Sequence, residues 1–350
     1  MKVLIYSNKQ NLIKYSGVGR ARDHQILALK SMGFDYTLNP RDDYDLIHIN
    51  TVFFSSYLAA VFNRLRGKTV VYHAHSTEED FRNSFKLSNL LSPLFKFWIM
   101  ACYRKADLIL TPSNYSKKLL RNYGIDKEIK VISNGIDLSY WKVDKKEKED
   151  FRKKYGYTNE DKVIMCSGLL IKRKGIMDFI EFAEKMPQYK FIWFGTCNKS
   201  LIPKEVSDRI KSAPKNCNFA GYIKRDDMRV AYQAVDLFLF PSYEETEGIV
   251  LLEALASRVK TLVRNLPVFD DYEENKDIYK ADSNDDFMDK IDKILSGELD
   301  DLTESGYKKV SEKSIENIGR QLVENYNEAA TISEASKSPI RKAIKDYIEK

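Results

Sequence analysis

Short apolar segments alternate with helix-like segments along most of the chain, and this alternation limits the possible folds more than any other feature. Apolar runs of about four to eight residues favour buried strands, and the segments between them carry apolar residues at helical spacing. The expected strands are KVLIYS, YDLIHIN, TVVYHAHS and ADLILTPS in the first half, and KVIMCSGLL, KFIWFG, NCNFAGY, VDLFLFPS and KTLVRN in the second. Such alternation predicts an α/β protein with doubly wound parallel sheets.

The length of the chain sets the number of domains. Its 350 residues suffice for two domains of about 150 residues each. A charge-rich stretch after SNGID interrupts the alternation near the middle. We therefore expect two Rossmann-like domains that face a cleft, with bounds 1–138 and 139–310, and a charged helical tail over 311–350 that packs back on the N-terminal domain.

Composition indicates the compartment. The four cysteines (Cys102, Cys166, Cys197 and Cys217) are isolated and form no CxxC pair, which favours a reducing environment over a disulfide framework or a zinc site. The apolar run in MKVLIYSNKQ is too short for a signal peptide, and no run reaches the roughly 20 residues of a membrane span. We expect a cytoplasmic protein that is soluble or peripheral.

Positive charge is concentrated in the first half. Residues 81–122 contain eight Lys or Arg residues and a single acid, Asp107. This bias indicates either an ordinary solvated basic face or a surface that meets an anionic membrane.

The stretch PSYEETEGIVLLEALAS combines two acids with an apolar helix. Glu245 lies in the loop after a strand, the helix begins near Gly248, and Glu253 follows eight positions after Glu245. Free N–H groups at a helix start bind anions, and carboxylates accept hydrogen bonds from sugar hydroxyls. The spacing therefore suits a ligand made of a sugar, a diphosphate and a second sugar, although Glu245 alone would also serve as a helix cap.

Two other strand-to-helix turns are candidate phosphate sites. Arg173 and Lys174 stand directly before Gly175 and a predicted helix at about 175–186. Gly17, with Gly19, lies between the first strand and the first helix, where it permits close approach of a phosphate or makes a simple tight turn. No third glycine completes a nicotinamide fingerprint.

Two histidines follow the third strand. His73 and His75 lie at the expected rim of the cleft, and one of them contacting a sugar is favoured over a metal site, because no third ligand is apparent. The acidic run from Asp42 to Asp45 precedes a strand and is interpreted as a turn. No metal site is expected.

The segment NLLSPLFKFWIMACYRKA predicts a helix over about 92–105, with Ser92 as N-cap and Pro93 in the first turn. Apolar residues cover nearly all of its faces, with Lys96, Arg104 and Lys105 among them. Both a core helix and a helix at a membrane interface fit this composition.

Taken together, these segments resemble the retaining GT-B glycosyltransferases of family 4 over nearly the whole chain. EETEGIVLLEA is similar to the E-x7-E signature of that family, and SNGID and the two strands ending in PS resemble other family segments. More narrowly, HSTEEDFRNSF, RKGI and EETEGIVLLEALASR resemble Gram-positive enzymes that add a second hexose to glucosyl-diacylglycerol, the glycolipid anchor of lipoteichoic acid.

The resemblance implies roles for individual residues. Glu245 would hold the donor sugar, Glu253 the ribose, Lys174 the phosphates, and His75 would lie near the reacting sugar. Arg173 would replace the usual arginine, because Leu169 occupies that position. Glu247, and the missing glycine in ASRVKTLV, also depart from the family pattern. The residues expected to line the nucleotide sugar are Gly17, Gly168, Tyr222, Gly248, Ile249, Val250 and Glu253.

The resemblance also implies an activity. A UDP-sugar, UDP-glucose or UDP-galactose, would donate its hexose with retention to a glycolipid in an anionic membrane, with no cofactor, no metal and no nucleic acid. The enzyme would bind the inner face of the cell membrane through residues 81–122. A polysaccharide or polyprenyl-linked acceptor, a nucleotide-sugar epimerase and a non-catalytic membrane adaptor are the alternatives.

Overall fold

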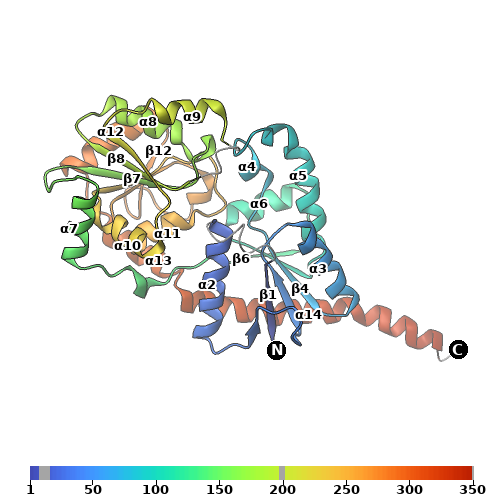
Figure 1. Ribbon diagram of the computed structural model, residues 1–350. Helices are drawn as coiled ribbons and strands as arrows, with labels where there is room; N and C mark the ends of the chain where they lie inside the picture. The colour runs from blue at the N-terminus through green and yellow to red at the C-terminus, as the bar shows by residue number, and fades with distance from the viewer. Residues whose placement is uncertain (8–15, 197–201, 349–350) are drawn as a thin grey trace. The chain divides into compact units, whose positions relative to one another are not determined.

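The chain folds into two compact units (Figure 1). The computed structural model describes residues 1–7, 16–196 and 202–348, with side chains up to residue 337. Cys197 lies outside the described residues. The first unit comprises residues 1–78, 93–135 and 315–350, and the second comprises 79–92 and 136–314.

The first unit is built on a six-stranded sheet whose described strand pairs are all parallel. In spatial order its strands are β2 (Tyr36–Thr37), β1 (Val3–Tyr6), β3 (Leu46–Ile49), β4 (Thr69–His73), β5 (Leu108–Thr111) and β6 (Glu128–Val131). Its helices are α2 (Gly17–Ser31), α3 (Phe54–Leu65), α4 (Glu78–Phe81), α5 (Ser88–Tyr103), α6 (Asn114–Asn122) and α14 (Ile315–Ile348). Residues 79–81 of α4 and residues 88–92 at the start of α5 belong to the second unit.

Alternation along the strands supplies a core on each face of this sheet. Val3 and Ile5 point into a cluster with α2 and α14, whereas Leu4 points into the opposite cluster with α3 and α5. Helix α14 presents Ile315, Ile318, Leu322, Tyr326 and Ala329, whose spacing of three and four residues marks one helical face. Figure 1 shows α14 running beneath the sheet beside α2. The C-terminal helix therefore completes the layer that a parallel sheet needs.

The second unit repeats the plan, and the strand pairs described for it are again all parallel. Its strand order is β12 (Tyr279–Ala281), β11 (Thr261–Arg264), β10 (Leu237–Phe240), β7 (Val163–Ser167), β8 (Lys190–Phe194) and β9 (Cys217–Gly221). The helices are η1 (Leu138–Trp141), α7 (Lys145–Lys154), η2 (Lys172–Lys174), α8 (Ile176–Lys185), α9 (Lys204–Lys211), α10 (Arg225–Ala234), α11 (Ile249–Ala256), η3 (Pro267–Phe269), α12 (Asn284–Ser296) and α13 (Thr303–Ser311).

The predicted α/β class is confirmed, although several strands and helices differ from expectation in detail. Strands β2, β6 and β12 were not predicted, because each is short and carries few apolar residues in a row. The prediction that Ser92 caps a helix was wrong, since α5 begins at Ser88 and contains Pro93 within its length. Pro93 removes one backbone hydrogen bond in the second turn of α5, and the carbonyl oxygen of Asn89, which would have accepted it, accepts from Ser92 Oγ over 3.2 Å instead.

Candidate donor and acceptor sites

The candidate donor site of the second unit surrounds the ends of β7 and β10. The chain runs outward from β7 to β8 and β9 and then returns to place β10 on the other side of β7. In parallel sheets such a reversal opens a crevice at the carboxyl ends of the two strands. Gly168 follows β7, and the loop with Glu245 follows β10, so both predicted segments lie at this crevice.

Lys174 and Glu245 form an ion pair at the centre of the site. The Lys174 ammonium donates to Glu245 Oε1, and both side chains are largely buried. The Lys174 stem lies next to Gly168, where it would be 3.6 Å from a Cβ. A buried lysine and carboxylate that hold each other in place can receive a phosphate and a sugar hydroxyl without a large rearrangement.

Helix α11 begins at the predicted position, with Gly248 as its N-cap. Gly248 has φ of 82°, and a Cβ on this residue would lie 2.8 Å from the ring of Phe240. Only glycine therefore allows the helix to start this close to β10. Ile249 and Val250 form the first turn, and the N–H groups of a first helical turn are candidate donors to an anion.

Glu253 is completely buried in the second turn of α11. The hydroxyl group of Tyr232 donates a hydrogen bond to Glu253 Oε2 over 3.0 Å. A buried carboxylate needs such a partner, and no local sequence pattern identifies it, since Tyr232 lies 21 residues earlier on α10.

Arg173 is used differently from its neighbour Lys174. Its guanidinium is buried and forms an ion pair with Asp80 (2.8 Å), and it donates to Ser84 Oγ and to the carbonyl oxygen of Glu244. These contacts tie segment 79–92 to the loop that carries Glu245. The arginine predicted to meet a phosphate thus organises the loop beside the candidate site.

A second arginine, missed in the sequence, supports the same loop. Arg264, at the end of β11, donates to the carbonyl oxygen of Pro241 and pairs with Asp178 of α8 over 3.0 Å. Its guanidinium also lies 4.1 Å from the centre of the Tyr243 ring. The strand KTLVRN was predicted as a core element only, and nothing local marked Arg264 as a loop support.

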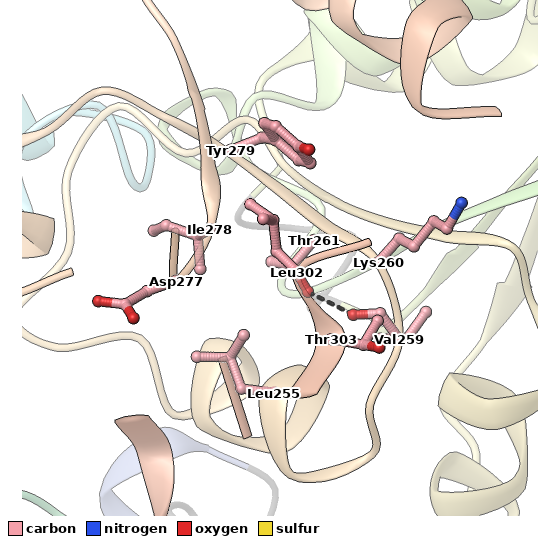
Figure 2. Close-up of a pocket in the computed structure, with 9 residues that line it drawn as sticks. All are labelled: Leu255, Val259, Lys260, Thr261, Asp277, Ile278, Tyr279, Leu302 and Thr303. Carbon is pink, nitrogen blue, oxygen red and sulfur yellow. Dashed lines mark hydrogen bonds between the residues drawn. The ribbon is translucent and has the colours of Figure 1, made fainter. Parts of the chain in front are cut away.

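Tyr222 follows β9 at the edge of the sheet and is half exposed. Figure 2 shows a different, very small cavity of about 10 Å³ between Leu255 of α11, Thr261 of β11 and Leu302, in which the Thr261 hydroxyl donates to the carbonyl oxygen of Val259. This cavity has room for one water molecule at most, so it is a packing defect and no substrate site.

The first unit holds the candidate acceptor site, centred on a stack of histidines. The rings of His48 and His73 lie 5.4 Å apart and those of His73 and His75 4.1 Å apart, all nearly parallel. Asn50 and Gln25 form a reciprocal amide pair beside them. The oxygen of Asn50 lies 2.9 Å from His75 Nε2.

The hydrogen bonds define one proton arrangement. Because Asn50 Oδ1 can only accept, His75 carries its proton on Nε2 and leaves Nδ1 as an acceptor. Gln25 donates to His73 Nδ1, and Tyr326 of α14 lies within 2.7 Å of His48 Nδ1. Burial lowers the pKa of His48 and of His75 to about 3, and the pKa of His73 also falls well below its usual value. The stack is therefore neutral at physiological pH.

Other predicted features lie outside these two centres. Gly17 is the first residue of α2, where Ser16 Oγ accepts from the N–H of Gly19, so the segment forms a capped helix start. Asp42 accepts from Thr37 and Asn39 in the turn before β3, as predicted. Within the described ranges no three His, Cys, Asp or Glu side chains group in a way that would hold a metal ion.

Two family models match the chain, in agreement with two α/β units that each carry polar groups at the carboxyl ends of parallel strands. Residues 23–140 match the model described as Glycosyltransferase Family 4, and residues 147–314 match Glycosyl transferases group 1. The Anabaena protein HepE, solved with UDP and glucose, has the same fold with a TM-score of 0.76, at 17% identity over 94% of this chain and all of that chain. These findings define a GT-B glycosyltransferase.

Relatives identify the family more closely. The processive diacylglycerol alpha-glucosyltransferase of Acholeplasma laidlawii is 41% identical over 95% of this chain and 99% of its own length. The alpha-galactosylglucosyldiacylglycerol synthase of Streptococcus pneumoniae is 27% identical over 64% of this chain and 61% of its own length. The chain belongs to glycosyltransferase family 4 and is a hexosyltransferase.

The neutral histidines predict a loss of stability in acid. In the unfolded chain each histidine has a pKa near 6.5, so below that pH the unfolded state binds more protons than the folded state. Between pH 7 and pH 5 each of the three should contribute a loss of about 2 kcal/mol in the free energy of unfolding. Urea unfolding of wild type and of His75→Gln at both pH values measures this. Equal pH dependence in the two proteins would contradict a neutral, buried His75.

The start of α11 predicts a contrast between two glycines. Gly248 and Gly297 both have φ near +80°, but only a Cβ on Gly248 would meet another residue within 3 Å. Gly297→Ala should cost about 1 kcal/mol of stability through backbone strain alone. Gly248→Ala should cost more and should also abolish UDP binding, measured by calorimetry. UDP binding that survives Gly248→Ala would remove α11 from the donor site.

Proposed function

We propose that this protein is a retaining α-glucosyltransferase that moves glucose from UDP-glucose to glucosyl-diacylglycerol in a membrane. The observation that carries this proposal is the buried Lys174–Glu245 pair beside the start of α11, at the strand crevice of the second unit. The name of the 41% identical relative supports an α-glucosyl product and a diacylglycerol-based acceptor. The neutral hydrogen-bonding face of His75 supports a role beside the reacting sugar.

The donor groups follow the charge that develops during transfer. As the bond to the sugar breaks, negative charge grows on the departing diphosphate, where Lys174 and the N–H groups of Ile249 and Val250 would stabilise it. Glu245 would hold the sugar hydroxyls, and Glu253 the ribose. Since no carboxylate is assigned as nucleophile, we infer displacement on the face that the leaving group vacates, with the leaving phosphate accepting the proton of the acceptor hydroxyl.

The acceptor lies in a bilayer, and two helices of the first unit offer a surface for it. Helix α3 exposes Phe54, Leu58, Phe62 and Leu65 on one face, while α5 exposes Leu94 and Phe97 and buries Ile99 and Tyr103. The helices touch through the stacked rings of Phe54 and Trp98, and Trp98 donates to the carbonyl oxygen of Val52. Helix α5 is therefore both a core helix and the carrier of an exposed apolar face.

Basic residues follow the two helices that carry this apolar face, which we define as the exposed residues Phe54, Leu58, Phe62, Leu65, Leu94 and Phe97. Arg66 lies over the Phe62 ring, and Arg104 is exposed at the end of α5. Apolar residues that enter the acyl region, with cations at the headgroups, favour anionic membranes. None of the described helices has the length and hydrophobicity to cross a bilayer. We therefore place the enzyme as a peripheral protein on the inner face of the cell membrane.

Galactose is the second candidate sugar, because one relative is named as a galactosylglucosyldiacylglycerol synthase. The assay gives the protein UDP-glucose or UDP-galactose with vesicles of phosphatidylglycerol that contain diacylglycerol, glucosyl-diacylglycerol or neither, and reads the lipids by mass spectrometry. Hexose transfer to glucosyl-diacylglycerol from UDP-glucose is the expected result. Donor turnover without an acceptor would indicate an epimerase, and UDP binding without lipid transfer would indicate another acceptor.

Glu245→Gln should reduce transfer by about 100-fold or more, because it removes the charge that holds both Lys174 and the sugar. The matched control is Glu205→Gln, which breaks the exposed Lys172–Glu205 pair in the same unit. Initial rates and thermal unfolding of both variants provide the measurement. If Glu245→Gln transfers as fast as Glu205→Gln, the donor site is assigned wrongly.

The apolar face predicts a specific loss of membrane binding. Replacing Leu94 and Phe97 together by serine should weaken binding to phosphatidylglycerol vesicles at least about tenfold, because both side chains lose their place in the acyl region. Leu38→Ser removes an exposed leucine of the same unit outside α3 and α5. Co-sedimentation should separate the two variants, while equal binding would place the membrane contact elsewhere.

A further inference from the structure

A second cavity of the second unit lies at the C-terminal end of α11, opposite the end that begins at Gly248. Its volume is about 390 Å³, within the range of small-molecule sites. It is lined by residues from four places: Trp141 at the end of η1, Lys148 of α7, Tyr232 and Gln233 of α10, and Ser257 after α11. Glu245 and Glu253 are not among the residues that line this cavity.

The charge of this cavity is entirely positive. Lys142, Lys148 and Arg258 line it, and none of the residues that line it is acidic. Arg258 is partly neutralised by Glu304 over 2.6 Å, whereas no ion pair involves Lys142 or Lys148 in the part of the chain that the structure describes. Two lysines from neighbouring segments that converge on one cavity favour a compact anion with several acceptor oxygens.

The walls add an aromatic side and a donor. Trp141 and Tyr232 pack edge to face, with ring centres 5.7 Å apart. The indole N–H of Trp141 is buried and has no hydrogen-bond partner among the residues that the structure describes. A buried donor without an acceptor is unfavourable, and native structures usually satisfy it or use it. A ligand that carries acceptor oxygens would accept hydrogen bonds both from the two lysines and from the indole N–H of Trp141.

Tyr232 connects the cavity to the donor site. It is one of the residues that line the cavity, and its hydroxyl group donates to Glu253 Oε2 and lies 3.3 Å from the carbonyl oxygen of Val250. A ligand that shifts Tyr232 therefore changes the position of Glu253 and of the first turn of α11. Two sites that share one hydrogen-bonded side chain are coupled in both directions.

We propose that this cavity binds a phosphate-bearing group, from a free organic phosphate or a phospholipid headgroup, and that its occupation alters UDP binding through Tyr232. The second half of this proposal rests on the proposed role of Glu253 in holding the nucleotide. The ligand class follows from the paired lysines, the size of the cavity and the unsatisfied indole donor.

The test uses the full-length protein and glycerol 3-phosphate as the soluble probe. Calorimetry measures glycerol 3-phosphate binding to wild type, to Lys148→Gln and to Lys146→Gln, a control on the same helix that does not line the cavity. Loss of one charge-assisted contact should weaken binding about tenfold in Lys148→Gln and leave Lys146→Gln unchanged. Equal effects of the two variants, or the absence of saturable binding to wild type, would overturn the site.

The coupling is measured by titrating UDP with and without saturating glycerol 3-phosphate. The affinity for UDP should change several-fold in wild type and remain constant in Tyr232→Phe, which keeps the ring but loses the hydroxyl contact with Glu253. Competition with UDP that Lys148→Gln does not relieve would place the phosphate in the donor site and overturn the proposal. UDP titration without the probe tests the donor site separately, so failure of the proposed function is recognised by itself.

Vesicles distinguish the two sources of phosphate. Transfer rates are compared in phosphatidylcholine vesicles, in the same vesicles with glycerol 3-phosphate, and in vesicles containing phosphatidylglycerol. Stimulation by the soluble probe identifies a free phosphate as sufficient, and stimulation by phosphatidylglycerol alone identifies a headgroup. In either case Lys148→Gln must reduce the stimulation and Lys146→Gln must not, or the cavity is not the site.

Discussion

The parallel pairing of β7 with β10 is the constraint on which the rest of the second unit depends. Because the strands run in the same direction, every return passes through a helix, and all of the loops that follow the strands gather at one edge. The chain goes from β7 to β8 in one direction across the sheet and from β10 to β11 in the other direction. The helices that follow β7 and β10 therefore pack on opposite faces of the sheet. Lys174 and Glu245, 71 residues apart, meet there as a consequence.

Three of the charges buried near that edge each meet another charge or a hydrogen-bond donor. Lys174 holds Glu245, Tyr232 holds Glu253, and Asp178 holds Arg264. Removing one partner leaves the other charge buried and unsatisfied, which costs far more than an exposed pair contributes. The same groups can exchange a protein partner for a phosphate or a hydroxyl, which is how a preorganised donor site accepts its ligand.

The first unit uses a different solution for its polar groups, because its histidines are neutral. Burial keeps them uncharged, and the Gln25–Asn50 pair sets the tautomer of His75. Tyr326 reaches this network from α14, so the C-terminal helix contributes to both the core and the polar stack. Helices α3 and α5, which carry the apolar face, pack on the opposite side of the sheet from α14. The two core clusters on these sides have no residue in common.

The sequence by itself determined the α/β class, the start of α11 at Gly248 and the eight-residue spacing of Glu245 and Glu253, because strand and helix periods and glycine positions are local properties. It left open whether α5 is a core helix or a helix at a membrane interface, and the structure shows that Ile99 and Tyr103 are buried while Leu94 and Phe97 are exposed. Only the tertiary structure decided that Arg173 pairs with Asp80, that Tyr232 holds Glu253 and that Asn50 orients His75. The physical reason is that a buried polar group takes its partner from whatever segment packs beside it, and that neighbour is set by the order of strands in the sheet rather than by nearby sequence.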